Sequence, residues 1–184
     1  MEGPGLKTEI TSGEHALGFR HAPVTLVMYG DYESPQCARA QGLVDRLMKN
    51  FGSDLRFVYR HFPTKKAHAR AERAAKAAEA AYGQGRFWEM HRLLFESSAE
   101  LNETVLTEAA AELGLNVVEF KDCIESSHCG TKVKRDVESG IRSGVDEAPA
   151  FLINDSRYLG LVEFEALRDE IQQKLDEETI RRAI

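Results

Sequence analysis

The sequence predicts a single α/β protein in which one central sheet is interrupted by an all-helical block. Three observations support this prediction. A strand–helix–strand pattern fills residues 24–61, residues 64–144 show one helical pattern after another, and a strand–strand–helix pattern follows. We therefore assign residues 20–63 and 145–176 to the sheet-containing core, 64–144 to a helical insertion, and residues 1–184 to one unit.

The first part of the core is expected to be a parallel strand pair joined by a helix. Residues 24–29 form a continuous β-branched and apolar run, which is typical of a strand covered on both faces. From Pro35 to Phe51 apolar residues recur every three or four positions, and this spacing predicts a helix. Residues 55–61 read as a second strand. The intervening helix is long enough for parallel pairing through a right-handed crossover.

The insertion and the end of the chain follow the same two periodicities. Apolar stripes at helical spacing predict five helices in the insertion, within residues 65–82, 87–95, 102–113, 117–124 and 133–141. After Gly144, residues 150–153 and 157–159 flank a turn and predict a hairpin, and residues 164–175 predict a last helix.

Composition and charge exclude several classes of protein. The chain holds 24 Lys and Arg against 30 Asp and Glu, which gives a net charge of −6, and no basic run suggests nucleic-acid binding. The apolar fraction of 42% excludes disorder. No apolar stretch approaches the ~20 residues of a membrane-spanning helix. Residues 1–10 show no secretory signal, so we expect a cytoplasmic protein, or a periplasmic one if a leader has been removed.

The motif Ser34-Pro35-Gln36-Cys37 lies where the first strand ends and the first helix begins. Ligands of open α/β sheets bind at such places, and a thiol near a helix start is biased towards thiolate. Besides this functional interpretation of the motif, two purely structural interpretations are open. Ser34-Pro35 suits the N-cap and first position of any helix. Cys37 falls on the apolar stripe, where a buried thiol is inert. The residues alone leave both interpretations open.

Four separated segments of the chain resemble the DsbA-like thioredoxin-fold family of thiol-disulfide oxidoreductases. They are VTLVMYGDYESPQCAR, RHFP, QGRFWEMHRLLF and GVDEAPAFLIN, at residues 24–39, 60–63, 84–95 and 144–154. The similarity covers about residues 15–176 and is greatest to a bacterial branch sometimes fused behind sodium/proton antiporters. The resemblance implies a thioredoxin fold with a helical insertion. It also implies a cis peptide bond between Ala148 and Pro149, in a loop that lies against the helix start and binds extended peptides.

The resemblance further implies a motif in which a first cysteine attacks a substrate disulfide and a second cysteine releases it. This chain keeps the second as Cys37 but has Ser34 at the first position. A hydroxyl cannot form a disulfide, so the two-cysteine cycle is impossible at these positions. Gln36 and Ala148 also depart from common family residues, which favours natural divergence over one engineered substitution.

Three hypotheses about function follow. The leading one is a DsbA-like oxidoreductase domain with a degenerate SPQC motif, in which Cys37 acts as a lone thiol or activity is reduced. The second is use of the Ser34 hydroxyl to bind glutathione, as in kappa-type glutathione transferases, which the family resembles in fold. The third is a non-catalytic peptide-binding or chaperone-like module. The expected partner is accordingly a protein or peptide thiol or disulfide, or glutathione, and we expect no cofactor beyond that.

The remaining cysteines and histidines suggest no further chemistry. In one continuous helix the Cα atoms of Cys123 and Cys129 would lie about 9 Å apart, so two free thiols are favoured over a disulfide. We expect Cys123 in the core and Cys129 more exposed. Three cysteines are an odd number, which favours a reducing compartment. The six histidines show no metal-binding spacing. His91 is predicted to be a core residue, and His61 to border the groove.

Overall fold

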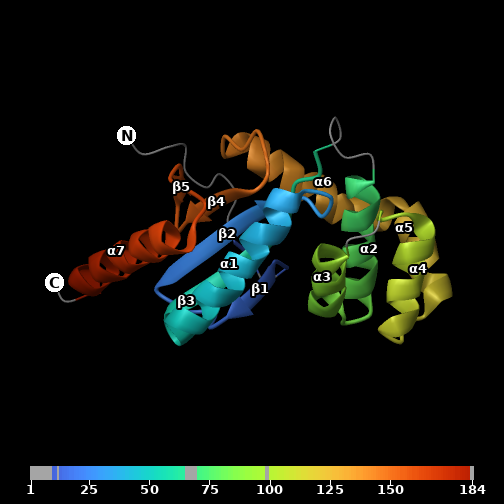
Figure 1. Cartoon of the computed structure of the whole chain (residues 1–184), viewed down its shortest axis with the longest axis horizontal. Helices are drawn as coiled ribbons and strands as arrows, with labels where there is room; N and C mark the ends of the chain where they lie inside the picture. The colour runs from blue at the N-terminus through green and yellow to red at the C-terminus, as the bar shows by residue number, and fades with distance from the viewer. Residues whose placement is uncertain (1–9, 12, 65–69, 98–99, 183–184) are drawn as a thin grey trace.

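The structure is a computed structural model that describes residues 10–11, 13–64, 70–97 and 100–182. Its centre is a five-stranded sheet in the order β1-β3-β2-β4-β5 (Figure 1). The strands are β1 (His15–Gly18), β2 (Val24–Gly30), β3 (Leu55–His61), β4 (Ala150–Ile153) and β5 (Ser156–Tyr158). None of the helices that the structure describes is both long and apolar enough to cross a membrane.

The pairing of the strands agrees with the predicted topology. β2 and β3 are parallel, with Val24 opposite Leu55 and Gly30 opposite His61, and the other three pairs are antiparallel. The helix α1 (Pro35–Phe51) connects β2 to β3. The hairpin of β4 and β5 turns at Asn154, which has a φ of 52°.

The edge strand β1 lies outside the core boundary of residue 20 that the sequence analysis set. It pairs antiparallel with β3. Only its first residue, His15, is buried, and its last two residues are exposed. A four-residue edge strand with so little burial has neither an apolar run nor a clear alternation, which is why the sequence pattern did not reveal it.

Both faces of the central strands are covered. Leu26 and Met28 pack into a core shared with α1 and with α7 (Phe164–Arg182). The alternate residues Val27 and Tyr29 pack into a second core against α6 (Ser127–Arg142), on the opposite face. This alternation explains the continuous apolar run of residues 24–29, because a strand buried on two faces needs no polar side.

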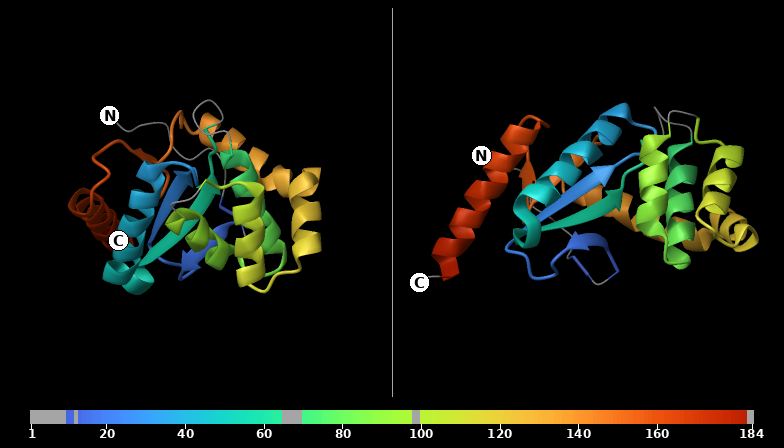
Figure 2. Two further views of the ribbon diagram at one scale, coloured as in Figure 1. Left: turned by 45° about the vertical axis from the view of Figure 1, so that its right-hand side comes forward. Right: turned by 60° about the horizontal axis from the view of Figure 1, so that its bottom comes forward.

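Four helices lie at the opposite end of the molecule from α7 (Figure 2). They are α2 (Ala71–Gly83), α3 (Phe87–Glu96), α4 (Glu103–Glu112) and α5 (Val117–Glu125), and α6 runs from this helical block along the sheet (Figure 1). These helices fall where the apolar spacing predicts them, and the described residues between β3 and β4 form no strand. The beginning of the helix expected at residues 65–82 lies outside the described residues.

Candidate functional site

The start of α1 is built by Ser34 and Pro35. Ser34 has an extended backbone, with φ −86° and ψ 117°, and Pro35 occupies the first helical turn. The Ser34 hydroxyl accepts a hydrogen bond from the backbone N–H of Cys37 at 3.3 Å. Ser34 also donates its own backbone N–H to the carbonyl oxygen of Asp31 at 3.1 Å. Ser34 is therefore the N-cap residue of the helix, as its position before Pro35 predicts.

Cys37 lies entirely inside the protein, in the core cluster that also contains Ala40 and Val44. The Asp31 backbone N–H donates to its sulfur at 3.4 Å. Burial and, to a lesser extent, the negative charge of Asp31 raise the pKa of the Cys37 thiol to about 11, although hydrogen bonding with Ser34 and with the Asp31 backbone opposes the shift. The loss of hydration thus outweighs the effect of the helix start.

The burial of Cys37 argues against the lone-thiol hypothesis. A substrate disulfide must reach a sulfur atom that is thiolate, and Cys37 is fully shielded and protonated at neutral pH. Its location suits a sulfur that reacts only with a neighbouring cysteine at position 34. Ser34 fills that position, so Cys37 has no sulfur partner there.

The loop that precedes β4 lies beside the start of α1. The Ala148–Pro149 peptide bond is cis, as the resemblance implies. Ala148 and Pro149 line a groove of about 740 Å³ together with Ser34 and Gln36. Pro35 lines a neighbouring hollow on the other side of the helix start, with Tyr32 and Phe95 among others. The fold thus brings Ser34, Gln36, Ala148 and Pro149 to one surface and places Cys37 beneath it.

The groove combines apolar walls with charges of both signs. Leu43, Val162 and Phe164 supply apolar surface. The guanidinium of Arg46 lies over the Phe164 ring, 3.9 Å from its centroid. The groove is also lined by Arg39, Glu147 and Glu163. Such a surface can pack against side chains of an extended segment and pair with charges of either sign along it.

The structure confirms the prediction for His91 and contradicts the prediction for His61. His91 is a core residue, as predicted: its Nδ1 is 2.9 Å from the Tyr32 hydroxyl and its Nε2 is 3.0 Å from Oε1 of Gln41. His61 does not border the groove, so that prediction is wrong. It is fully buried, and its Nε2 lies 2.8 Å from Oε1 of Glu79. The last residue of β3 turns its side chain towards α2 because the helical block covers that end of the strand.

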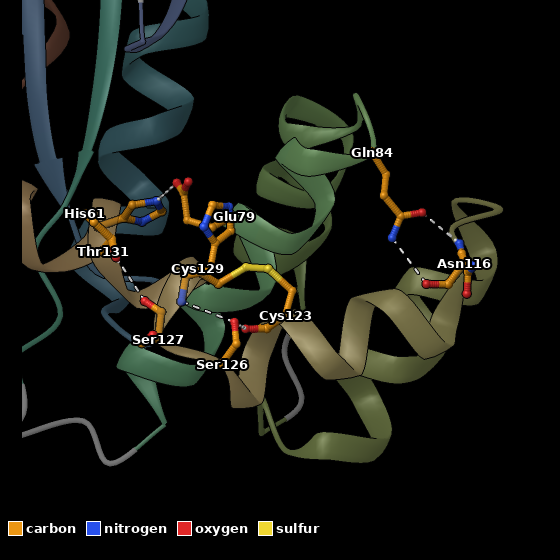
Figure 3. Close-up of a disulfide and its surroundings, with 10 residues drawn as sticks. His61, Glu79, Gln84, Asn116, Cys123, Ser126, Ser127, Cys129 and Thr131 are labelled. Carbon is orange, nitrogen blue, oxygen red and sulfur yellow. Dashed lines mark hydrogen bonds and ion pairs between the residues drawn. A yellow bond between two sulfur atoms is a disulfide. The ribbon is translucent and has the colours of Figure 1, made fainter.

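Cys123 and Cys129 form a disulfide, contrary to the expectation of two free thiols (Figure 3). The helix is not continuous between them. Ser126 breaks it with an extended backbone and caps α6 by accepting from the N–H of His128, so the two Cα atoms lie 5.6 Å apart. Cys129 is buried and Cys123 is half-buried, the reverse of the predicted exposures. The odd cysteine count therefore no longer supports a reducing compartment.

We expect removal of this disulfide to destabilise the protein modestly. In the chain-entropy model the cross-link closes so short a loop that its contribution is about 2 kcal/mol. The variant Cys123→Ser, Cys129→Ser should therefore lose about 2 kcal/mol of unfolding free energy in urea denaturation. Dithiothreitol should lower the stability of the unmodified protein by a similar amount and leave the double variant unchanged. Equal stability of both proteins without reductant would contradict this prediction.

Comparisons with known proteins agree with this architecture. A sequence model of the family described as "Thioredoxin" matches residues 10–173. A thioredoxin-like oxidoreductase from Silicibacter pomeroyi superposes with a TM-score of 0.81 at 28% identity, over 90% of this chain and 94% of that one. BdbD from Bacillus subtilis, in its oxidised form, superposes with a TM-score of 0.81 at 21% identity, over 95% and 97% of the two chains.

Curated relatives are named as antiporters. A Na(+)/H(+) antiporter NhaA 1 of Salinispora arenicola is 39% identical over 154 residues, which are 84% of this chain and 24% of the relative. An NhaA antiporter of Herminiimonas arsenicoxydans is 39% identical over 80% of this chain and 23% of its own length. The chain thus spans about a quarter of these relatives. The β-α-β and β-β-α halves and the cis-proline loop beside the helix start agree with this match, and this chain belongs to the thioredoxin family.

Proposed function

We propose that this domain binds an extended peptide segment in the groove between the start of α1 and the cis-proline loop, without two-cysteine exchange of its own. One observation carries the proposal. Ser34, Gln36, Ala148 and Pro149 line one groove, while the cysteine that remains of the motif is shielded beneath it. This arrangement supports binding of a substrate at the groove without attack by a sulfur atom.

The groove is suited to a peptide in two respects. An extended chain bound beside a strand entrance gains backbone hydrogen bonds, and its side chains then need neighbouring apolar pockets. The loop at Ala148 precedes β4 directly, and Val162 and Phe164 supply apolar surface on the far side. Outside the groove, Leu159 and Leu161 are about two-thirds exposed and extend this apolar surface. We therefore expect segments that carry apolar side chains to bind best.

Glutathione is less well supported as the ligand. A serine that activates a bound thiol must donate a hydrogen bond from its hydroxyl to the thiolate. The Ser34 hydroxyl already donates to Oε1 of Gln36 at 3.2 Å and accepts from the Cys37 N–H. Ser34 is only 2% exposed. Binding of glutathione in this manner would require the Gln36 contact to break first.

We expect the protein to bind the carboxymethylated B chain of insulin, an extended peptide without free thiols, in a fluorescence-anisotropy titration. Val162→Asp should weaken binding about tenfold, since it places a charge on the apolar wall of the groove. Val118→Asp is the matched control, because Val118 is also exposed but lies on α5 outside the groove. Its affinity should equal that of the unmodified protein.

The same titration distinguishes the alternatives. Equal weakening by Val162→Asp and Val118→Asp would place peptide binding outside the groove and contradict the proposal. Absence of peptide binding, together with specific retention on glutathione-agarose that Ser34→Ala abolishes, would establish the glutathione hypothesis instead.

A further inference from the structure

Three buried side chains, distant in the sequence, converge between the sheet and the helical block. His15 comes from β1, His61 from the end of β3 and Glu79 from α2, and their exposures are 3%, 0% and 8%. Nε2 of His15 lies 2.5 Å from Oε1 of Glu79, and Nε2 of His61 lies 2.8 Å from the same oxygen. The three atoms all lie within 4.8 Å of one another. Figure 3 shows Glu79 facing His61 across this space.

The three donor atoms are of the kinds that bind a metal ion. Metal ions bind the ionised carboxylate and the neutral imidazole. Both Nε2 atoms face one carboxylate oxygen of Glu79. An imidazole that binds a metal ion through Nε2 carries its proton on Nδ1.

The surroundings hold the imidazole rings in place. The ring of Phe87 stacks on His15 with centroids 3.5 Å apart and an angle of 9° between the planes. The rings of Tyr32 and Tyr59 flank the ring of His61, with centroid distances of 6.0 and 5.4 Å. Nδ1 of His61 has no hydrogen-bond partner among the residues that the structure describes, so no contact there fixes the tautomer. The atom bound at Nε2 therefore decides which ring nitrogen carries the proton.

We propose that His15, His61 and Glu79 form a binding site for a zinc ion that joins β1, β3 and α2. Two imidazole nitrogens and one carboxylate oxygen are the donors of many zinc sites, whereas Ca²⁺ and Mg²⁺ prefer oxygen donors alone. Tetrahedral zinc holds such donors about 3.3 Å apart. The two nitrogen–oxygen distances, 2.5 and 2.8 Å, need to lengthen by less than about 1 Å, and the two nitrogens already lie within 4.8 Å of each other. A water molecule completes the four ligands.

The site has a structural consequence for the peptide groove. His61 pairs with Gly30 at the end of β2, directly before the segment that leads to Ser34. A metal ion at His61 would tie this strand end to the edge strand and to the helical block. The inference does not depend on the proposed function, because the three ligands lie outside the groove.

We expect the protein, after metal has been removed with a chelator, to bind one equivalent of Zn²⁺ in a calorimetric titration. If the folded protein does not admit the ion, the same stoichiometry is expected in protein refolded with ZnCl₂. Zinc should raise the melting temperature by about 5 °C. Cobalt chloride, added in place of zinc, should give the intense visible absorption of four-coordinate Co²⁺. His15→Gln should abolish the cobalt spectrum and the thermal shift, whereas His128→Gln, on the exposed surface of α6, should retain both.

Two results would overturn the proposal. The first is a protein that holds no zinc after either titration or refolding and shows no thermal shift. The second is a cobalt spectrum that survives in both His15→Gln and His61→Gln, which would place the metal elsewhere. If these variants do not fold, the zinc stoichiometry and cobalt spectrum of the unmodified protein test the proposal. Octahedral Co²⁺ absorbs only weakly, so a weak cobalt spectrum would also contradict a four-coordinate site.

Discussion

Ser34→Cys is expected to create thiol-disulfide oxidoreductase activity, which we expect the unmodified protein to lack. Position 34 lies at the start of α1, where unpaired backbone N–H groups and the helix dipole favour a thiolate. Its side-chain oxygen is 3.3 Å from the Cys37 backbone nitrogen, so a sulfur there is placed beside Cys37. We expect a gain of about 100-fold or more in insulin reduction with dithiothreitol. Gln36 and Ala148 should keep the rate below that of a typical family member.

Two further variants make this result interpretable. Ser34→Ala removes the N-cap hydroxyl without adding a sulfur and should remain inactive. Ser34→Cys combined with Cys37→Ala retains the attacking thiol but not the resolving one, so it should accumulate a mixed disulfide with substrate and not turn over.

Robust activity in the unmodified protein would contradict the prediction and would point to Cys123 and Cys129, which Cys123→Ser, Cys129→Ser would then test. A Ser34→Cys protein that forms the 34–37 disulfide but remains inactive would show that the chain has lost more than its attacking sulfur.

Cys37 is expected to resist alkylation in the folded protein. Its pKa is about 11, against an ordinary value of 9.0, so its thiolate fraction at pH 7 is about 100-fold lower than in the unfolded chain. Its complete burial slows the reaction further. Because the folded pKa is raised, the rate with iodoacetamide should increase about tenfold per pH unit up to about pH 11, rather than level off near pH 9.

The disulfide leaves Cys37 as the free cysteine of the chain, so the incorporation of one label reports on this residue. Urea above the unfolding transition should restore the rate of an ordinary cysteine, and Cys37→Ala provides the background. A folded-state rate equal to the rate in urea at pH 7 would show that the sulfur is accessible, and it would revive the lone-thiol hypothesis.

The sequence by itself determined the fold and the place of the site. Its apolar periodicities locate β2, α1, β3 and the helices of the insertion, because each of these elements buries a continuous stripe or run. A serine followed by a proline, as at Ser34 and Pro35, is the preferred sequence at a helix N-cap, and this preference is a local property of the backbone. The absence of a sulfur at position 34 also needs no structure, since it excludes the two-cysteine cycle from chemistry alone.

The properties that depend on contacts between distant residues could be known only from the tertiary structure. The state of Cys37 results from competition between burial and the helix start, and the sequence contains both influences but not their magnitudes. The disulfide required the break at Ser126, which shortens a distance that a continuous helix would make too long. His15, His61 and Glu79 are separated by 46 and 18 residues, and only the packing of α2 against the sheet brings them together. Local spacing cannot reveal such a cluster, because its members share no helix or turn.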